Sequence, residues 1–217
     1  MAEPTCWMDL ETPAALVDVD RMAANLEKVG EYCKKWGISY RPHAKTHKSP
    51  ELARKQMAVG AVGMTVATMK EAEVMAAACR DILMAYPPVG KPRMDRLLSL
   101  PQDVRLSVAL DSSQALQGLA RAATAAGRQV TVLIEVDMGM GRVGVQGISE
   151  AVRLAEETAG SAGIQYGGIL IYPGHIRMPT GEQLPEIQVS TARLATLLET
   201  LAGAGLPPTV VSGGSTP

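Results

Sequence analysis

A basic stretch in the first quarter of the chain holds the most concentrated chemistry in the sequence. Residues 39–48 read SYRPHAKTHK. If residues 39–45 form a strand, its period of two places Arg41, His43 and Lys45 on one face. Burying several cations together is unfavourable unless an anion compensates them, and a bound anionic cofactor would do so. The alternative, a solvated basic strand at the surface, is disfavoured by the proline within the run.

Metal binding is the weaker interpretation of this stretch. His43 and His47 have the i, i+4 spacing of a helical zinc pair, but the preceding proline and the strand pattern argue against a helix. Cys6, Cys33 and Cys79 are far apart and lack a C-x-x-C spacing, which indicates reduced thiols rather than a disulfide framework or a zinc site. We expect no metal site within this chain.

A second stretch combines an apolar run with carboxylates, glycines and one arginine. Residues 131–144 read TVLIEVDMGMGRVG, in which a strand ends in an acidic pair at i, i+2 and enters a Gly-rich loop. The glycines allow positive φ, and Arg142 offers a fixed fork of donors to an oxygen anion. An ordinary strand-to-helix turn with a salt-bridged arginine would show the same pattern, so both interpretations stay open.

Two further strand ends carry polar groups. Residues 167–175 read GGILIYPGH, so an apolar strand leads to Tyr172 and His175, either as site residues or as a core tyrosine with a loop histidine. Residues 210–217 read VVSGGSTP. Consecutive small residues after a strand expose N–H groups and hydroxyls, as in the phosphate sites of barrel enzymes. The alternative for this last stretch is a frayed terminus.

The elements that must position these residues follow a repeated strand–helix rhythm. Short Val- and Ile-rich runs alternate with stretches of helical period, which favours a (β/α) barrel over an open sheet. We expect strands at residues 14–20, 39–45, 62–67, 82–86, 106–110, 131–137, 167–172 and 209–212. The clearest helices are expected at residues 21–36, 49–59, 70–80, 114–126, 149–158 and 190–204. Residues 68–71 have the spacing of a capping box at one helix start.

Composition excludes several classes of protein. The 217 residues are 47% hydrophobic and 20% charged, with 21 basic against 22 acidic residues, so no overall basic field attracts nucleic acid or an anionic membrane. No apolar run approaches the roughly 20 residues that cross a bilayer. The N-terminus lacks a secretory signal, which indicates a cytoplasmic protein. With two Trp, five Tyr and no Phe, the core must consist of Ala, Val, Leu, Ile and Met.

Taken together, the four stretches resemble one family. The run RPHAKTHK is similar to the cofactor-lysine motif of the fold-type III pyridoxal-phosphate (PLP) enzymes related to D-threonine aldolase and eukaryotic-type D-serine dehydratase. The runs EVDMGMGRVG, YPGH and SGGST are similar to further segments of that family, in the same order. The resemblance covers nearly all of the chain. It implies an α/β fold, the (β/α)8 TIM barrel of the alanine racemase N-terminal type, incomplete in this chain.

The resemblance also implies roles for individual residues. Lys45 would be the catalytic lysine to which PLP attaches, and burial among Arg41 and His43 would make it a neutral nucleophile. Arg142 would approach the phenolic oxygen of PLP, and Tyr172 would line its ring. The phosphate would be held by Ser212, Gly213, Gly214, Ser215 and Thr216. The candidates for contact with substrate or for support of the site are His43, His47 and His175.

The implied activity is that of a lyase on D-3-hydroxy amino acids. Retro-aldol cleavage would give glycine and an aldehyde, whereas loss of the Cα proton and the β-hydroxyl would give a 2-oxo acid and ammonia. An amino-acid racemase is the alternative among enzymes, because the Arg142 loop is shared. A PLP-binding homeostasis protein without catalytic activity is the alternative outside enzymes.

Members of the family continue beyond the length of this sequence. The resemblance implies a further barrel strand and a β-rich domain, in which a His and an Asp or Cys bind a divalent metal, Mn, Mg or Zn. We therefore expect a fragment, with residues 1–20 associated with the missing β-domain and residues 21–217 forming the barrel. The resemblance also implies a homodimer at full length and a small D-amino acid as substrate, with no nucleic acid or membrane partner.

Overall fold

Parallel strands form the centre of the fold. The computed structural model describes residues 6–215. Within them, six strands form one sheet in the order β1 to β6, and every neighbouring pair is parallel. The strands are β1 (Met64–Val66), β2 (Asp81–Met84), β3 (Arg105–Leu110), β4 (Val130–Val136), β5 (Ile164–Ile171) and β6 (Val210–Ser212). Each parallel pair requires a crossover, which the chain makes with helices.

A helix connects each strand of the sheet to the next, and within residues 6–215 two further helices precede β1. The helices are α1 (Val19–Lys35), α2 (Pro50–Ala58), α3 (Met69–Met75), α4 (Lys91–Leu98), α5 (Ser113–Ala125), α6 (Ile148–Ala159) and α7 (Leu184–Gly203), with short 3-10 turns at Trp7–Asp9 and Thr180–Glu182. The side chains that cap α1, α2, α3 and α5 are Asp18, Ser49, Thr68 and Ser112. Each cap accepts a backbone N–H that the helix leaves free, so these helix starts are determined locally.

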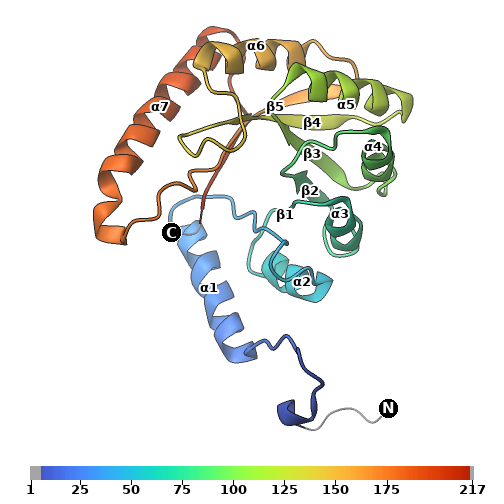
Figure 1. Cartoon of the computed structure of the whole chain (residues 1–217), viewed down its shortest axis with the longest axis vertical. Helices are drawn as coiled ribbons and strands as arrows, with labels where there is room; N and C mark the ends of the chain where they lie inside the picture. Colours follow the sequence, from blue (N-terminus) through green and yellow to red (C-terminus); the bar gives the residue numbers. More distant parts are fainter. Residues whose placement is uncertain (1–5, 216–217) are drawn as a thin grey trace.

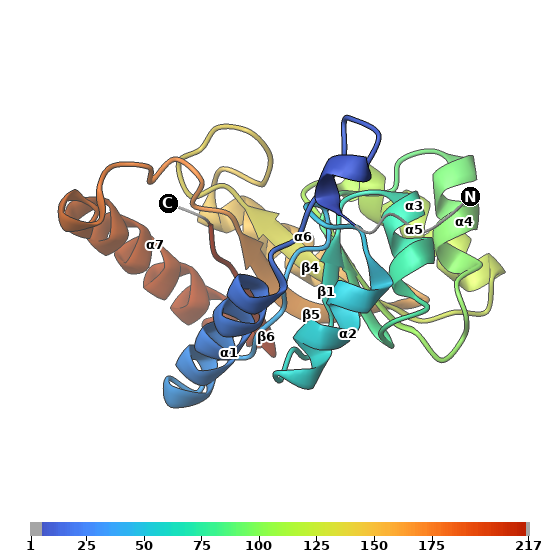
Figure 2. The ribbon, with the colours of Figure 1, turned by 90° about the horizontal axis from the view of Figure 1, so that it is seen from below.

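The sheet curls into a half-barrel with a hydrophobic layer on each face. Helices α3 to α6 lie along its outer side (Figure 1), and a view turned by 90° shows the same curled arrangement (Figure 2). The main core lies between strands and helices. A smaller cluster on the other face consists of Leu83, Ala109, Leu133 and Leu170. Among the described residues the buried apolar side chains are Ala, Val, Leu, Ile and Met, as expected, with Cys79 in addition.

The expected strands are confirmed for β1 to β6, and two expectations differ from the structure. The strand expected at 39–45 is present only as two parallel bridges, Tyr40 with Ala61 and His43 with Thr65. No strand is seen at 14–20 in the described residues, where residues 14–18 are irregular and exposed and α1 begins at Val19, so the expected extent to residue 20 is wrong. A strand requires a hydrogen-bonded neighbour, and within residues 6–215 none pairs with this segment.

Three helices differ from the sequence expectations. α3 ends at Met75, five residues before the expected end at 80. α4 was not among the helices expected from the sequence; it has eight residues and no side-chain cap, so its local signal is weak, yet it buries Met94, Leu97 and Leu98. α7 begins at Leu184, six residues before the expected start at 190, with a proline in its first turn. In the part of the chain that the structure describes, no helix is long and apolar enough to span a bilayer.

Candidate functional site

The carboxyl ends of all strands meet at one edge of the half-barrel. This follows from the parallel arrangement, since every strand runs in the same direction. The segments that leave the sheet at this edge carry most of the candidate residues. They include Lys45 after the 40–43 segment, Tyr86 after β2, Asp111 after β3, the loop 137–144 after β4, Tyr172 after β5 and residues 212–215 at the end of β6.

Lys45 lies in a tight turn that follows the bridge at His43. The Ala44 N–H donates to the Thr65 carbonyl at 2.8 Å, which joins the turn to β1. Ala44 is fully buried and Lys45 is exposed. The Lys45 N–H donates to His43 Nδ1 at 3.2 Å. Burial lowers the pKa of His43, and the charge of Lys45 lowers it further, so His43 is neutral when it accepts this bond.

The basic residues expected on one face around Lys45 do not lie together in the structure. Arg41 donates to Asp81 Oδ1 at 2.7 Å, and Asp81 Oδ2 lies 3.0 Å from Arg105. Asp81 begins β2, so this cluster lies at the amino ends of the strands, whereas Lys45 lies in the turn after the bridge at His43. The expectations that Arg41 surrounds Lys45 and that Lys45 is buried are therefore wrong. A carboxylate of the protein, rather than a cofactor, compensates Arg41.

His47 connects the lysine turn to α2. Its Nδ1 accepts the Ser49 N–H at 3.0 Å, and its Nε2 lies 3.2 Å from Gln56 Oε1. Because Nδ1 accepts, Nε2 carries the proton and donates to Gln56. Both ring nitrogens are thus used within the protein. Nothing in this geometry supports the alternative of a zinc pair with His43, and within residues 6–215 no three metal-ligating side chains are gathered.

The loop after β4 is organised by a carboxylate. Asp137 accepts N–H groups from Gly139, Met140 and Gly141 at 2.9–3.0 Å and the Gln146 side-chain amide at 2.9 Å. Burial alone would raise the pKa of Asp137, but these hydrogen bonds together lower it. Asp137 therefore stays ionised as the centre of the loop. Of the acidic pair seen in the sequence, this member is structural.

Arg142 extends from this loop against aromatic rings. Its guanidinium carbon lies 4.6 Å from the ring centroid of Tyr172 and 5.9 Å from that of Tyr86. A cation over an aromatic face is attracted by the ring quadrupole, so the two rings orient the guanidinium. The structure thus brings together Arg142 and Tyr172. Tyr86 was not recognised from the sequence, although an aromatic residue directly after a strand is a usable signal.

Glu135 is a buried carboxyl group beside Arg142. It is 4% exposed, on the same face of β4 as Leu133 in the inner cluster, and lines a small cavity with Arg142 and Tyr172. Burial raises its pKa to about 7; the charge of Asp111 raises it as well, whereas Arg142 lowers it. Such a group exchanges a proton near neutral pH. Its sequence signal is the acidic pair at the end of the apolar run, of which it is the first member.

The segments after β5 and β6 lie against each other. Ser215 Oγ donates to the Pro173 carbonyl at 3.4 Å. His175 packs on Gly139, where an added Cβ would lie 3.1 Å from His175 Nε2, and its buried Nδ1 has no hydrogen-bond partner among the described residues. Gly214 has a φ of +136° and open space around it. Ser212, Gly213, Gly214 and Ser215 are thus placed beside the tyrosine segment, whereas Thr216 lies outside the described residues.

The chain matches the model of a known family, described as alanine racemase, N-terminal domain, over residues 17–217. It belongs to this family. The match includes the lysine turn, the Arg142 loop and the segment after β6. The expected barrel of the alanine racemase N-terminal type is confirmed, as a half-barrel within the described residues.

Relatives within the family are named for lyase reactions. A D-threonine aldolase from Arthrobacter sp. is 31% identical over 210 residues, which is 95% of this chain and 55% of the relative. A D-threo-3-hydroxyaspartate dehydratase from Delftia sp. (strain HT23) is 37% identical over 217 residues, 97% of this chain and 56% of the relative. The chain therefore spans about half the length of these curated relatives.

A solved family structure gives the same arrangement in three dimensions. The crystal structure of D-threonine aldolase from Filomicrobium marinum matches with a TM-score of 0.90 and 32% identity, over 96% of this chain and 57% of that one. The alanine racemase from Streptomyces lavendulae matches with a TM-score of 0.69 at 23% identity, which shows the fold alone. The resemblance to the aldolase and dehydratase relatives is thus confirmed.

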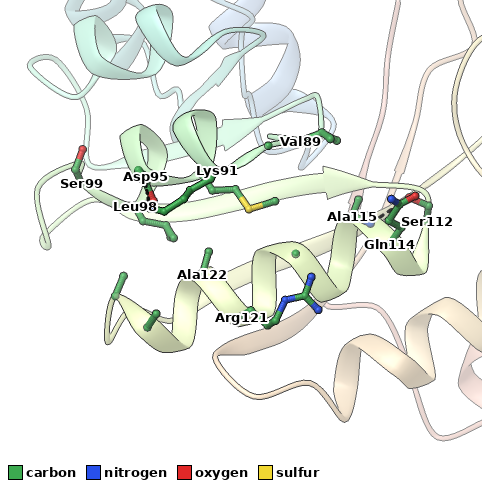
Figure 3. Close-up of a pocket in the computed structure, with 15 residues that line it drawn as sticks. Val89, Lys91, Asp95, Leu98, Ser99, Ser112, Gln114, Ala115, Arg121 and Ala122 are labelled. Carbon is green, nitrogen blue, oxygen red and sulfur yellow. Dashed lines mark hydrogen bonds and ion pairs between the residues drawn. The ribbon is translucent and has the colours of Figure 1, made fainter.

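A second hollow in this family member lies away from the strand ends. A groove of about 850 Å³ separates α4 from α5 on the outer side of the half-barrel (Figure 3). Lys91 and Asp95, which line it, form an ion pair with each other at 2.7 Å. Small residues of α5, such as Gly118 and Ala122, form much of the opposite wall. The groove gathers no nucleophile with a neighbouring base, so the strand-end edge is the candidate site.

Proposed function

We propose that this chain is the cofactor-binding barrel of a PLP-dependent lyase that acts on D-3-hydroxy amino acids. The observation that carries the proposal is the gathering of Lys45, the Arg142–Tyr172 pair and residues 212–215 at one edge of the sheet. The names of the aldolase and dehydratase relatives support the reaction class. Because the chain spans about half of those proteins, the activity is proposed for the longer protein that contains it.

The residues at the strand ends fit PLP by their chemistry. Lys45 is exposed and offers a primary amine. Residues 212–215 offer two hydroxyls and the N–H groups beside Gly214, whose surroundings are open. Hydroxyls and backbone N–H groups are the donors that hold a phosphate. Arg142 offers a permanent positive charge to an anionic oxygen of the ring. Thr216 belongs to the predicted phosphate segment and stays a prediction.

Each residue of the site has a separate task in this proposal. PLP, when bound, supplies the electron sink for cleavage at Cα. Lys45 acts as the nucleophile that holds the cofactor, and neutral His43 fixes its backbone through Nδ1 without adding a charge. The Glu135 carboxyl group holds or releases a proton beside Arg142 near neutral pH.

Further properties of the longer protein are proposed with this function. The relatives include aldolases and a dehydratase, so the proposal is a lyase reaction rather than one of the two products. A racemase ranks lower, because the alanine racemases compared here share the fold at 17–23% identity. A divalent metal (Mn, Mg or Zn) and a homodimer stay predictions for the full length. The free thiols of Cys6, Cys33 and Cys79 support the proposed cytoplasmic location.

Covalent capture of PLP tests the proposal. The purified chain is mixed with PLP, its visible absorbance is recorded, and borohydride reduction is followed by peptide mass analysis. We expect the reduced cofactor on the peptide that contains Lys45. Lys45→Ala should abolish both the absorbance band and the labelled peptide.

Lys55→Ala is the matched control for this experiment. Lys55 is an exposed lysine on α2, so its loss removes an amine without changing the strand-end edge. Its removal should leave the labelling of Lys45 unchanged. Labelling spread evenly over several lysines, or equal labelling of the Lys45→Ala chain, would show that Lys45 is not the cofactor lysine.

A further inference from the structure

Glu71 is a buried carboxylate to which the proposed chemistry gives no task. Its side chain is 5% exposed. Its N–H donates to Thr68 Oγ1 at 3.2 Å, which confirms the predicted cap of α3. The carboxylate does not return to the Thr68 N–H as in a standard capping box; its Oε2 accepts the Ala67 N–H at 2.8 Å. One carboxylate oxygen is thereby attached to the end of β1.

The other oxygen of Glu71 faces the lysine turn. Oε1 lies 3.6 Å from Lys48 Nζ, and Lys48 is the last residue of the RPHAKTHK run. A buried carboxylate needs a compensating cation, and Lys48 is the ion-pair partner that the structure gives it. The charge of Glu71 also acts on His43, where it opposes the lowering of the histidine pKa. Glu71 therefore contacts the last residue of the lysine run and acts on His43 through its charge.

Lys48 has an unusual backbone conformation. With a φ of +51°, it is the one non-glycine residue with positive φ among residues 6–215. Its N–H donates to the Ala44 carbonyl at 2.8 Å and closes the turn around Lys45. Glycine or asparagine usually occupies such a position, because a Cβ is crowded there. A lysine at this position indicates that its side chain is needed.

The turn is thus attached to β1 at both ends. At the first end, the Ala44 N–H donates to the carbonyl of Thr65 in β1. At the second end, Lys48 contacts Glu71, and Glu71 accepts the N–H of Ala67, directly after β1. Lys45 lies between these attachments. The exposed side chain of Lys45 has no hydrogen bond or ion pair among the described contacts, so the backbone of the turn determines where its amine lies.

We propose that Glu71 and Lys48 are positioning residues whose ion pair holds the turn that presents Lys45. The inference rests on the proposed function for the role of Lys45 itself. Neither residue touches the reacting atoms; both act through the backbone of residues 44–48. Loss of either charge should loosen the turn and slow the attachment of PLP to Lys45.

Amide hydrogen exchange of the 217-residue chain without cofactor is the first test. Glu71→Gln keeps an oxygen for the Ala67 N–H and removes the charge, and Lys48→Met removes the amine. Each should raise exchange at the Lys48 amide about fivefold, the effect of losing one modest ion pair. Lys48→Arg should restore slow exchange. Lys70→Met, which removes an exposed lysine next to Glu71 in sequence, is the matched control and should have no effect.

The rate of PLP attachment is the second test. Glu71→Gln and Lys48→Met should attach PLP about fivefold more slowly than the parent chain, and Lys48→Arg should attach it at nearly the parent rate. Lys48→Gly separates the backbone from the side chain, because it relieves the positive φ but lacks the amine. We expect it to be as slow as Lys48→Met.

The outcomes of the two tests distinguish the two proposals. If Lys45→Ala captures PLP like the parent chain, the proposed function fails, yet the exchange measurement still reports on the Glu71–Lys48 attachment. If exchange at Lys48 is unchanged in both charge variants, or if Lys48→Gly behaves like the parent chain, the positioning role is wrong. Exchange of core amides in β3 and β4 shows whether a variant is folded, and the Lys48→Arg rescue separates a lost charge from general destabilisation.

Discussion

The guanidinium carbon of Arg142 lies 4.6 Å from the ring centroid of Tyr172, so the loops after β4 and β5 share one wall of the candidate site. Gly174 keeps that ring in place, since an added Cβ at this position would lie 2.3 Å from Tyr172 Cε1. The arrangement depends on the aromatic face rather than on the hydroxyl. Removal of the Tyr172 ring and removal of its hydroxyl should therefore have different effects on the site.

Tyr172→Leu should weaken PLP binding about fivefold, which corresponds to a cation–π contact of about 1 kcal/mol. Tyr172→Phe keeps the ring and should bind PLP nearly as well as the parent chain. An absorbance titration with PLP measures both dissociation constants. The ring of Tyr86 is more distant from the Arg142 guanidinium, at 5.9 Å. Tyr86→Leu is therefore the control, and it should weaken PLP binding less. Equal weakening by Phe and Leu at position 172 would assign the effect to the hydroxyl.

Glu135→Gln should change how stability depends on pH. The pKa of Glu135 is raised by burial from 4.5 to about 7, so the folded state binds this proton more tightly than the unfolded state. The free energy of unfolding should therefore fall as pH rises from about 4.5 to about 7, by an amount on the order of 3 kcal/mol at most. The free energy of unfolding of the Gln variant lacks this decrease. Relative to the parent chain, the variant should therefore become more stable as pH rises over that range. Urea unfolding at several pH values measures it.

Asp137→Asn is the contrasting variant for the same measurement. Hydrogen bonds lower the pKa of Asp137 despite its burial, so its stabilisation is present above its ordinary pKa and lost as pH falls through the folded value. The Asn variant should therefore be less stable than the parent chain at neutral pH and approach it in acid. Parallel pH profiles for the parent chain and Glu135→Gln would contradict the assignment of the raised pKa.

Asp81→Ala should destabilise the fold through the cluster at the amino ends of the strands. Asp81 is 17% exposed and pairs with Arg41 at 2.7 Å and Arg105 at 3.0 Å. Removing the carboxylate leaves Arg41 half-buried without its partner, which should cost about 2 kcal/mol of unfolding free energy. The exposed pair of Lys91 and Asp95 is the control, and Asp95→Ala should cost under about 1 kcal/mol. Equal losses at the two sites would show that burial does not matter here.

Gly144→Ala should be poorly tolerated in the Arg142 loop. Gly144 has a φ of +100°, and an added Cβ would lie 2.5 Å from the Asp137 backbone nitrogen. The backbone conformation alone should cost about 1–3 kcal/mol. Gly147→Ala is the matched control, because no atom lies within 4 Å of its added Cβ. Chemical unfolding of both variants checks the difference, and a neutral Gly144→Ala would show that the loop rearranges freely.

The sequence by itself determined the α/β class, the alternation of strands β1 to β6 with most of their helices, and the stretches that hold the candidate residues. Its information is local: apolar runs, the alternation of side chains along a strand, and capping residues such as Ser49 and Thr68 specify elements without distant partners. The residues that end strands could also be grouped, because parallel strands place all their carboxyl ends at one edge.

Only the tertiary structure decided which charged residues lie next to each other. The alternation along residues 39–45 placed Arg41 and Lys45 on one face, but it did not show that Asp81 neutralises Arg41 at the amino ends of the strands. Nor could it show that Glu71 reaches Lys48, or that Glu135 is buried beside Arg142. The pairings of Arg41 with Asp81 and of Lys48 with Glu71 join residues far apart in the chain. Their strength depends on distance and burial, which a linear pattern does not contain.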